Sequence, residues 1–103
     1  MPQNPIAVSN VLNPKAKPVL NITVATVVKA TPGNLLSLTV VVAGSSTGTI
    51  NDCATTGAAA AANTVAVLPD SVGPVPLPAV GLACATGIVV TPGTGQTIAV
   101  TYQ

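Results

Sequence analysis

The sequence predicts an all-β protein, a β-sandwich or jelly roll of seven to eight short antiparallel strands with an extended N-terminal arm. Val, Ala and Thr supply 47 of the 103 residues, and Val and Thr favour strands because their branched side chains pack well on a pleated surface. Ten Pro and nine Gly residues punctuate the chain and limit any helix to a short piece. Between these turn residues, short runs alternate apolar and polar side chains, which is typical of half-buried strands.

We expect the arm to cover residues 1–18 and a single β-sandwich domain to cover residues 19–103. Prolines interrupt the first segment, and no alternation is sustained in it. Two interpretations remain open, an arm that docks on the body or on a neighbouring chain and a loosely ordered terminus. Docking is favoured by large aliphatic side chains, which a solvated tail hardly needs. These candidate partner contacts are Ile6, Val8, Val11 and Leu12.

Two longer strands are expected in the first half of the domain. The run from Val19 places its apolar side chains on one face, namely Leu20, Ile22, Val24 and Val28. A Pro-Gly turn at 31–34 separates it from the run 35–43. The apolar face of that second run contains Leu36, Leu38, Val40 and Val42. Because Val41 makes its second half apolar on both sides, we expect a central strand there.

The middle of the chain predicts shorter elements. Strands are expected around 49–54 and 63–68. The five alanines at 58–62 allow either a single helical turn or a tight segment where two backbones approach. Pro76 and Pro78 cannot donate to a ladder, so the run 75–79 is confined to a sheet edge or an extended loop.

The C-terminal residues predict a β-hairpin. Residues 87–90 and 96–102 have strand character, and the Gly-rich segment 91–95 joins them. Ile98, Val100 and Tyr102 are in phase on the second strand, which makes the tyrosine a core or rim residue. Since the chain has no Phe or Trp, the core is expected to be thin and filled by Val, Leu and Ile.

The charge inventory excludes several classes of function. Charged residues are 5% of the chain, against about 25% in an ordinary soluble domain. With no His and no Glu, acid-base catalysis has few groups to use, and we do not expect an enzyme. Lys15, Lys17 and Lys29 are too few for a phosphate backbone, so nucleic acid is not an expected partner. No apolar run approaches the roughly 20 residues that span a bilayer, and no secretory signal pattern precedes the domain.

The cysteines leave two interpretations open. Cys53 and Cys84 are reduced thiols if the protein is made and kept in the cytoplasm. The alternative is a Cys53–Cys84 disulfide closing a loop of roughly 30 residues, which could add on the order of 3 kcal/mol. Asp52 and Asp70 complete the supply of catalytic or ligating groups. The Asp52 carboxylate should raise the pKa of the neighbouring Cys53 thiol, so we expect no nucleophile there. A zinc site needs more ligands than this chain supplies, so we expect no metal, and we expect no cofactor.

Five segments carry a family resemblance that spans most of the domain. They are 25–33 (ATVVKATPG), 42–45 (VAGS), 54–60 (ATTGAAA), 84–90 (CATGIVV) and 92–96 (PGTGQ). These segments resemble a group of small virion proteins encoded by tailed bacteriophages. The resemblance implies a β-sandwich or jelly-roll structural protein, of the head decoration or cement type, that clamps neighbouring major capsid subunits. It implies no catalytic residue, and the proline-rich segment 72–82 has no counterpart in it.

We therefore expect a non-enzymatic capsid decoration protein on the outer surface of a virion. Its expected partners are the major capsid protein and other copies of itself, most simply as a homotrimer. Composition favours the same class, because strand edges without charged residues are normally covered by a partner. Two alternatives are a tail, neck or fibre component of the virion and a cell-surface adhesion or binding module.

Overall fold

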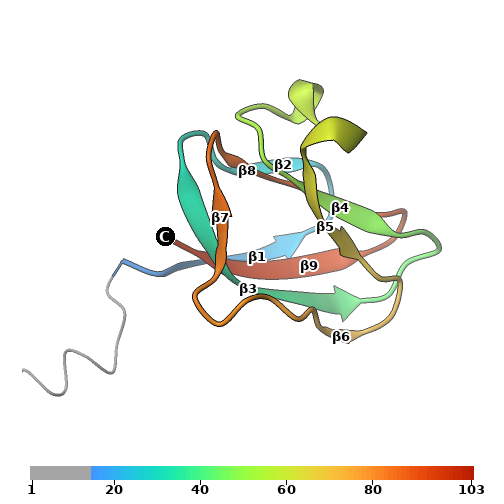
Figure 1. The fold of residues 1–103 in the computed structure, drawn as a ribbon. Coiled ribbons are helices and arrows are strands. Elements are labelled where there is room, and N and C mark those ends of the chain that lie inside the picture. Colours follow the sequence, from blue (N-terminus) through green and yellow to red (C-terminus); the bar gives the residue numbers. More distant parts are fainter. Residues whose placement is uncertain (1–14) are drawn as a thin grey trace, which may run out of the picture.

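Two antiparallel β-sheets face each other in the computed structural model, which describes residues 15–103 (Figure 1). The first sheet contains β1 (Lys17–Ile22), β9 (Thr97–Tyr102), β3 (Gly33–Val42) and β6 (Gly73–Pro74) in spatial order, with β7 (Leu82–Cys84) also paired to β3. The second contains β2 (Thr26–Lys29), β8 (Ile88–Thr91), β4 (Gly48–Asn51) and β5 (Thr64–Leu68). The predicted all-β sandwich is confirmed.

The strand pairing is that of one long hairpin rolled around a core. β1 pairs with β9, β2 with β8, β3 with β6 and β7, and β4 with β5. Since β6 and β7 both lie along β3, they act as two pieces of one interrupted strand. The pairs β3–β9 and β4–β8 then join successive turns of the roll. This wrapping is the jelly-roll form of the sandwich.

Aliphatic side chains fill the space between the sheets. Those fully buried there include Leu35, Leu38, Val40, Ile50, Leu68, Ile88, Val90 and Ile98. Tyr102 packs against this cluster at its margin. The core is therefore built from Val, Leu and Ile, as the sequence predicts.

The expected face of the first strand is only half right, because Ile22 and Val28 face the core but Leu20 and Val24 do not. Leu20 and Val24 are each 68% exposed, whereas Ile22 is 3% exposed. Asn21 has φ 58°, and the register with β9 shifts between Val19 and Ile22. Asn tolerates this left-handed conformation better than most residues. The bulge turns Val19 and Ile22 to the core and Leu20 to the surface, and the chain then crosses to β2 in the other sheet.

The second predicted strand is central, with β9 on one side and β6 and β7 on the other. Its expected face is only half right. Leu38 and Val40 are buried, but Leu35 joins them and Val42 is 48% exposed. Register shifts between Leu35 and Ser37 and between Val40 and Val42 change the phase at both ends of β3. Irregularities of this kind break the period of two on which the prediction depends.

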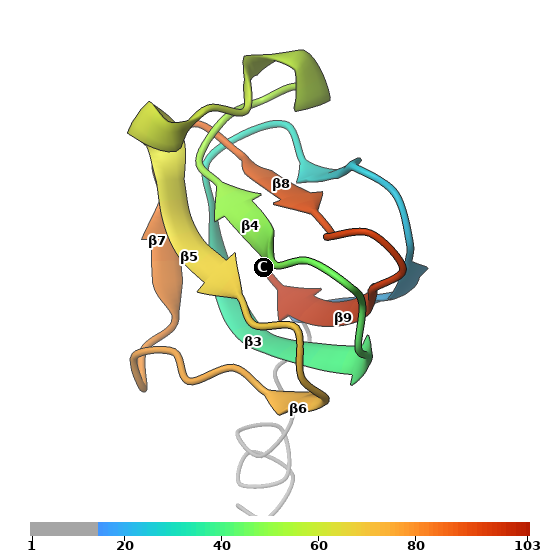
Figure 2. The ribbon, with the colours of Figure 1, turned by 90° about the vertical axis from the view of Figure 1, so that its right-hand side faces the viewer.

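The C-terminal hairpin is also wrong. β8 pairs with β2 and β4, whereas β9 pairs with β1 and β3 in the other sheet. Figure 2 shows the chain passing from one sheet to the other between β8 and β9. Gln96 is 1% exposed at this crossing. Its Oε1 accepts from the Gly93 N–H at 2.7 Å, and its Nε2 donates to the Pro69 carbonyl at 2.7 Å.

The shorter elements lie close to their predicted positions. The strands expected around 49–54 and 63–68 are β4 and β5. The alanine segment forms two single 3-10 turns, η1 (Thr56–Ala58) and η2 (Ala61–Asn63). Residues 75–79 form no strand, which is the loop alternative of the two that their prolines allow. Lys17 and Pro18 belong to β1 and not to the arm, because they pair with Tyr102 and Thr101.

Candidate functional site

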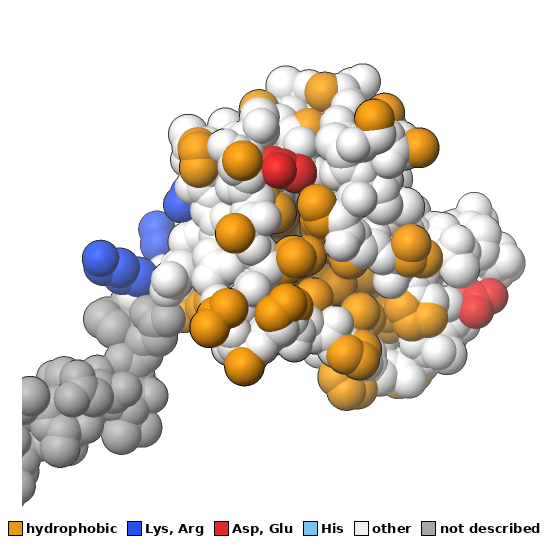
Figure 3. All heavy atoms as spheres, in the orientation of Figure 1, with side chains coloured by type: hydrophobic (Ala, Val, Ile, Leu, Met, Phe, Trp, Pro, Cys, Tyr) orange, Lys and Arg blue, Asp and Glu red, His pale blue; other side chains and the backbone are white. Residues whose placement is uncertain are grey.

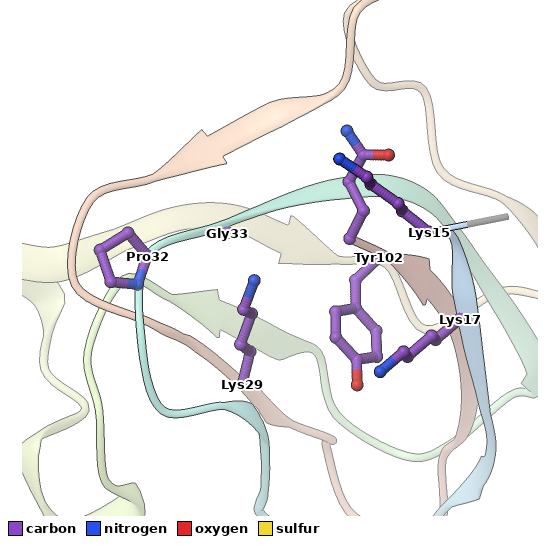
Figure 4. A pocket seen from close by; sticks show the side chains of 7 residues that line it. Lys15, Lys17, Lys29, Pro32, Gly33 and Tyr102 are labelled. Atoms are coloured by element: carbon purple, nitrogen blue, oxygen red, sulfur yellow. The ribbon is translucent and has the colours of Figure 1, made fainter. Parts of the chain in front are cut away.

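A basic groove lies at the end of the sandwich where β1 begins and β9 ends (Figure 4). Its volume is about 580 Å³. The residues that line this lysine groove are Lys15, Lys17, Lys29, Pro32, Gly33, Tyr102 and Gln103. They include all three lysines and the single tyrosine of the chain. The whole cationic charge of the side chains is thus gathered in one place.

The jelly-roll pairing brings these residues together. Lys17 lies directly opposite Tyr102, because the first strand pairs with the last. Directly opposed residues on neighbouring strands have Cβ atoms about 5 Å apart. Lys29 is the last residue of β2, and Gly33 begins β3 after a short turn. Figure 4 shows Tyr102 between Lys17 and Lys29.

Gly33 makes room for the stem of Lys29. A Cβ added at Gly33 would lie 2.7 Å from Cδ of Lys29 and 2.9 Å from the Gln103 carbonyl oxygen. Next to it, Asn34 and Gln103 exchange two backbone hydrogen bonds of 2.8 and 2.9 Å, which hold β9 against β3. Hydrogen-bonded backbone and the lysine side chains therefore both line the groove.

Neither aspartate lines the lysine groove. Figure 3 shows the lysines at one end of the molecule and the two carboxylates elsewhere on the surface. No Asp or Glu side chain is among the residues that line the groove. The positive side-chain charges are therefore concentrated at one end of the molecule, and this end is suited to bind an anionic group.

Asp52 is held by three backbone donors. Its carboxylate accepts from the N–H groups of Ala85 at 3.0 Å, Thr86 at 2.7 Å and Gly87 at 3.2 Å. The Thr86 N–H, followed by that of Ala85, holds the pKa of the Asp52 carboxyl below its ordinary value, and that of Gly87 adds to this against some desolvation. The carboxylate therefore connects two loops and is not available as a catalytic base.

Cys53 and Cys84 are both free thiols and both buried. Their Sγ atoms contact local carbonyl oxygens, that of Thr55 at 3.4 Å and that of Leu82 at 3.9 Å. Burial raises the pKa of the Cys84 thiol, and the charge of Asp52 raises it further. A buried thiol with a raised pKa, such as that of Cys84, is a poor nucleophile.

A second hollow, of about 340 Å³, lies beneath the alanine segment. Asn51 stands in it, 2% exposed, and its Nδ2 donates to Asn63 Oδ1 at 2.9 Å and to Thr64 Oγ1 at 3.0 Å. Its Oδ1 accepts from Thr49 Oγ1 at 2.8 Å. The Thr91 hydroxyl also borders the hollow and has no protein partner. These contacts fasten the loop between β4 and β5 to the sheet.

The outer strand of the second sheet has an uncovered apolar edge. Within residues 15–103, β5 pairs only with β4 and contains neither a charged residue nor a proline. Val67 of β5 is 56% exposed, and Val72 in the following turn is 67% exposed. We call β5 with these two side chains the valine edge. Figure 3 shows hydrophobic side chains gathered on the face formed by β5, β6 and β7.

The opposite edges of the two sheets are protected. Lys17 and Pro18 lie on β1, and Lys29 lies on β2. Lysine and proline on an edge strand oppose pairing with another chain. The strand of the valine edge carries neither kind of residue, so its edge is open to pairing with a second protein.

The predicted partner contacts Ile6, Val8, Val11 and Leu12 lie outside the described residues. The sequence does not predict the lysine groove, because three lysines are too few to indicate a nucleic-acid site and the pattern places Tyr102 in the core or at its rim. The available signal was topological, since a jelly roll pairs its first strand with its last. Among residues 15–103 no cluster of three or more His, Cys, Asp or Glu side chains could hold a metal ion. That part of the chain also has no helix long and apolar enough to cross a membrane.

Comparisons with protein-family models, with curated proteins and with solved structures find no match to this chain. Functional inference therefore depends on its own residues and geometry.

Proposed function

We propose that this protein is a non-enzymatic structural protein of a bacteriophage virion, a decoration protein that binds the major capsid protein on the outside of the shell and stabilises it as a homo-oligomer. The observation that carries the proposal is the valine edge. An edge strand with exposed valines and no charge or proline is a template for contact with another protein. The resemblance of the five sequence segments to small phage virion proteins supports the choice of partner.

The state of the reactive groups supports a structural role. Asp52 is held by three backbone N–H groups, and both thiols are buried. Asp70 is an exposed turn residue. The lowered pKa of Asp52 keeps its carboxylate ionised and hydrogen-bonded to the backbone, and Cys84, whose thiol pKa is raised, is buried.

The valine edge is tested by placing charge on it. We expect Val67→Lys/Val72→Lys to weaken binding to expanded capsids of the encoding virus by at least about tenfold, because a charge is desolvated at the centre of the contact. Leu20→Lys/Val24→Lys is the matched control, since these side chains are at least as exposed but lie on β1 and the turn after it. Co-sedimentation measures binding, and a heat challenge measures capsid stability.

Unaltered capsid binding by the Val67→Lys/Val72→Lys protein would remove the valine edge from the proposal. Capsids that neither bind the wild-type protein nor gain stability from it would end the decoration role itself. Immunogold labelling of virions then separates a tail, neck or fibre position from the shell.

The oligomeric state needs its own measurement. We expect sedimentation equilibrium of the wild-type protein to give a trimer, the simplest closed ring for a threefold capsid position. The circular dichroism of each variant must match that of the wild type, so that a loss of assembly is not a loss of folding. A monomer at every concentration, both free and on capsids, contradicts the homo-oligomer.

A further inference from the structure

We propose that the lysine groove binds a carboxylate-bearing segment of a partner protein, an acidic loop or terminus that lies across the ends of β1, β2 and β9. This inference rests on the proposed function, because it supplies the chemistry of a second contact with the protein partner. It places two different contacts on opposite sides of the sandwich, an apolar one at the valine edge and an ionic one at the groove.

Positive charges from both sheets converge on the groove. Lys17 and Lys29 come from strands of different sheets, yet both line the same groove. Like charges that share a groove repel each other, and an anion placed between them removes that cost. The Tyr102 ring lies between the two lysines, and its hydroxyl can donate a hydrogen bond to a carboxylate.

The backbone of the groove makes room for one of its lysines. Lys29 is only half-exposed, since its stem packs over Gly33. A lysine that only protects a sheet edge from pairing does not need a glycine that makes room for its side chain. Pro32, Gly33 and the tyrosine ring add apolar wall. A volume of about 580 Å³ admits several side chains of a peptide, within the usual range for ligand sites.

The small number of cations selects the class of anion. Nucleic acid binding draws on a long series of phosphate contacts and on stacking platforms. This chain has three lysines, no arginine and one aromatic residue. Such a set matches a few carboxylates on one short protein segment.

A labelled peptide tests the groove without capsids. We expect a fluorescein-labelled hexaglutamate peptide to bind the full chain saturably at low salt, as measured by fluorescence anisotropy, and a hexaglutamine peptide not to bind. Lys17→Gln/Lys29→Gln should weaken hexaglutamate binding by about tenfold, as expected for the loss of two ion pairs. Tyr102→Phe should weaken it by about threefold through the lost hydroxyl.

A second variant separates local from overall charge. Thr47→Glu/Ser71→Glu has the same formal net charge as Lys17→Gln/Lys29→Gln, because 3 − 4 and 1 − 2 are both −1. Thr47 and Ser71 are both exposed. They lie near the far end of β3, a strand of 10 residues, and a strand rises about 3.3 Å per residue. This variant should bind hexaglutamate nearly as well as the wild type. If the two variants lose binding equally, the groove is not the site.

Charge reversal separates binding from edge protection. Lys17→Glu/Lys29→Glu keeps a charge on each edge strand, so it should remain as soluble as the wild type while losing hexaglutamate binding. Retained binding would overturn the proposal. Inorganic phosphate at matched ionic strength is the competitor that tests the ligand class, and displacement of the peptide by phosphate but not by acetate would also overturn it.

The two proposals fail separately. Hexaglutamate binding with no capsid binding ends the decoration role and leaves the groove as a carboxylate site. Capsid binding that is indifferent to Lys17→Gln/Lys29→Gln, together with no peptide binding, ends the groove and leaves the decoration role.

Discussion

Asp52 and Thr86 are 34 positions apart in the sequence, yet the Thr86 N–H donates to Asp52 Oδ1 at 2.7 Å. The bond ties the loop after β4 to the loop before β8. Gly87 completes the contact, because a Cβ there would overlap the Cys53 carbonyl oxygen and lie 2.7 Å from that of Lys29. Asp52 is thus an anion that the backbone N–H groups of the loop before β8 hold in place.

Replacing this anion should destabilise the fold. We expect Asp52→Asn to lower the free energy of unfolding by about 1–3 kcal/mol, because hydrogen bonds to a charged acceptor become bonds to a neutral one. Chemical denaturation monitored by circular dichroism measures the change. Asp70→Asn is the control, since Asp70 is exposed. Equal stabilities of the two variants would contradict the role of Asp52.

The same carboxylate predicts an acid dependence. The folded pKa of Asp52 lies below its ordinary value of 3.8, so its contribution is complete above that value and is lost as pH falls through the folded pKa. Thermal melts of the wild type should therefore decline steeply below about pH 4. The Asp52→Asn melts should decline less over the same interval. Parallel curves for the two proteins would show that Asp52 does not cause the decline.

Gln96 should be among the most sensitive polar positions. We expect Gln96→Ala to cost about 2–4 kcal/mol, because it leaves the Gly93 N–H and the Pro69 carbonyl without partners and opens a cavity. Thr94→Ala, in the same loop but exposed, should cost little. The comparison is made by urea denaturation. A cost below that of Thr94→Ala would show that the crossing from β8 to β9 does not depend on the glutamine.

Two glycines offer a matched pair for steric crowding. A Cβ at Gly93 would overlap the Ser46 carbonyl oxygen and lie 2.7 Å from that of Thr47, whereas one at Gly57 would meet nothing within 4 Å. We expect Gly93→Ala to cost about 1–3 kcal/mol by overpacking. Gly57→Ala should be neutral or stabilising by up to about 1 kcal/mol. Differential scanning calorimetry decides between them, and equal melting temperatures would contradict the crowding.

The thiols should be unreactive in the native protein. Cys53 and Cys84 are 4% and 2% exposed, and burial raises the pKa of Cys84. We expect a maleimide to modify the native protein slowly and to add two groups per chain after denaturation without reductant. Mass spectrometry counts the groups. No modification of the unreduced, denatured chain would establish the Cys53–Cys84 disulfide instead.

Local features of the sequence were predicted well because their causes are local. Pro76 and Pro78 are consistent with the absence of a strand at 75–79, and the alternation around Leu38 and Val40 correctly marks a strand with one buried face. The errors begin where one residue changes the phase. Asn21 in the left-handed region exposes Leu20, and no period-two pattern reports such a bulge.

The lysine groove could not be predicted for a related reason. Lys17 and Tyr102 stand at the two ends of the described domain, and nothing in their neighbouring residues says that they face each other. Only the rolling of the long hairpin sets the first strand beside the last. The uncovered state of β5 follows from the same order of strands.

By itself the sequence determined an all-β sandwich with an aliphatic core, because strand propensity, turn residues and the lack of aromatic side chains act within a few positions. The tertiary structure alone decided which strands are neighbours, since that choice depends on contacts between distant segments. It separated β8 from β9 at the buried Gln96, gathered three lysines around one tyrosine and left Val67 exposed. The two proposed contact surfaces follow from those long-range pairings.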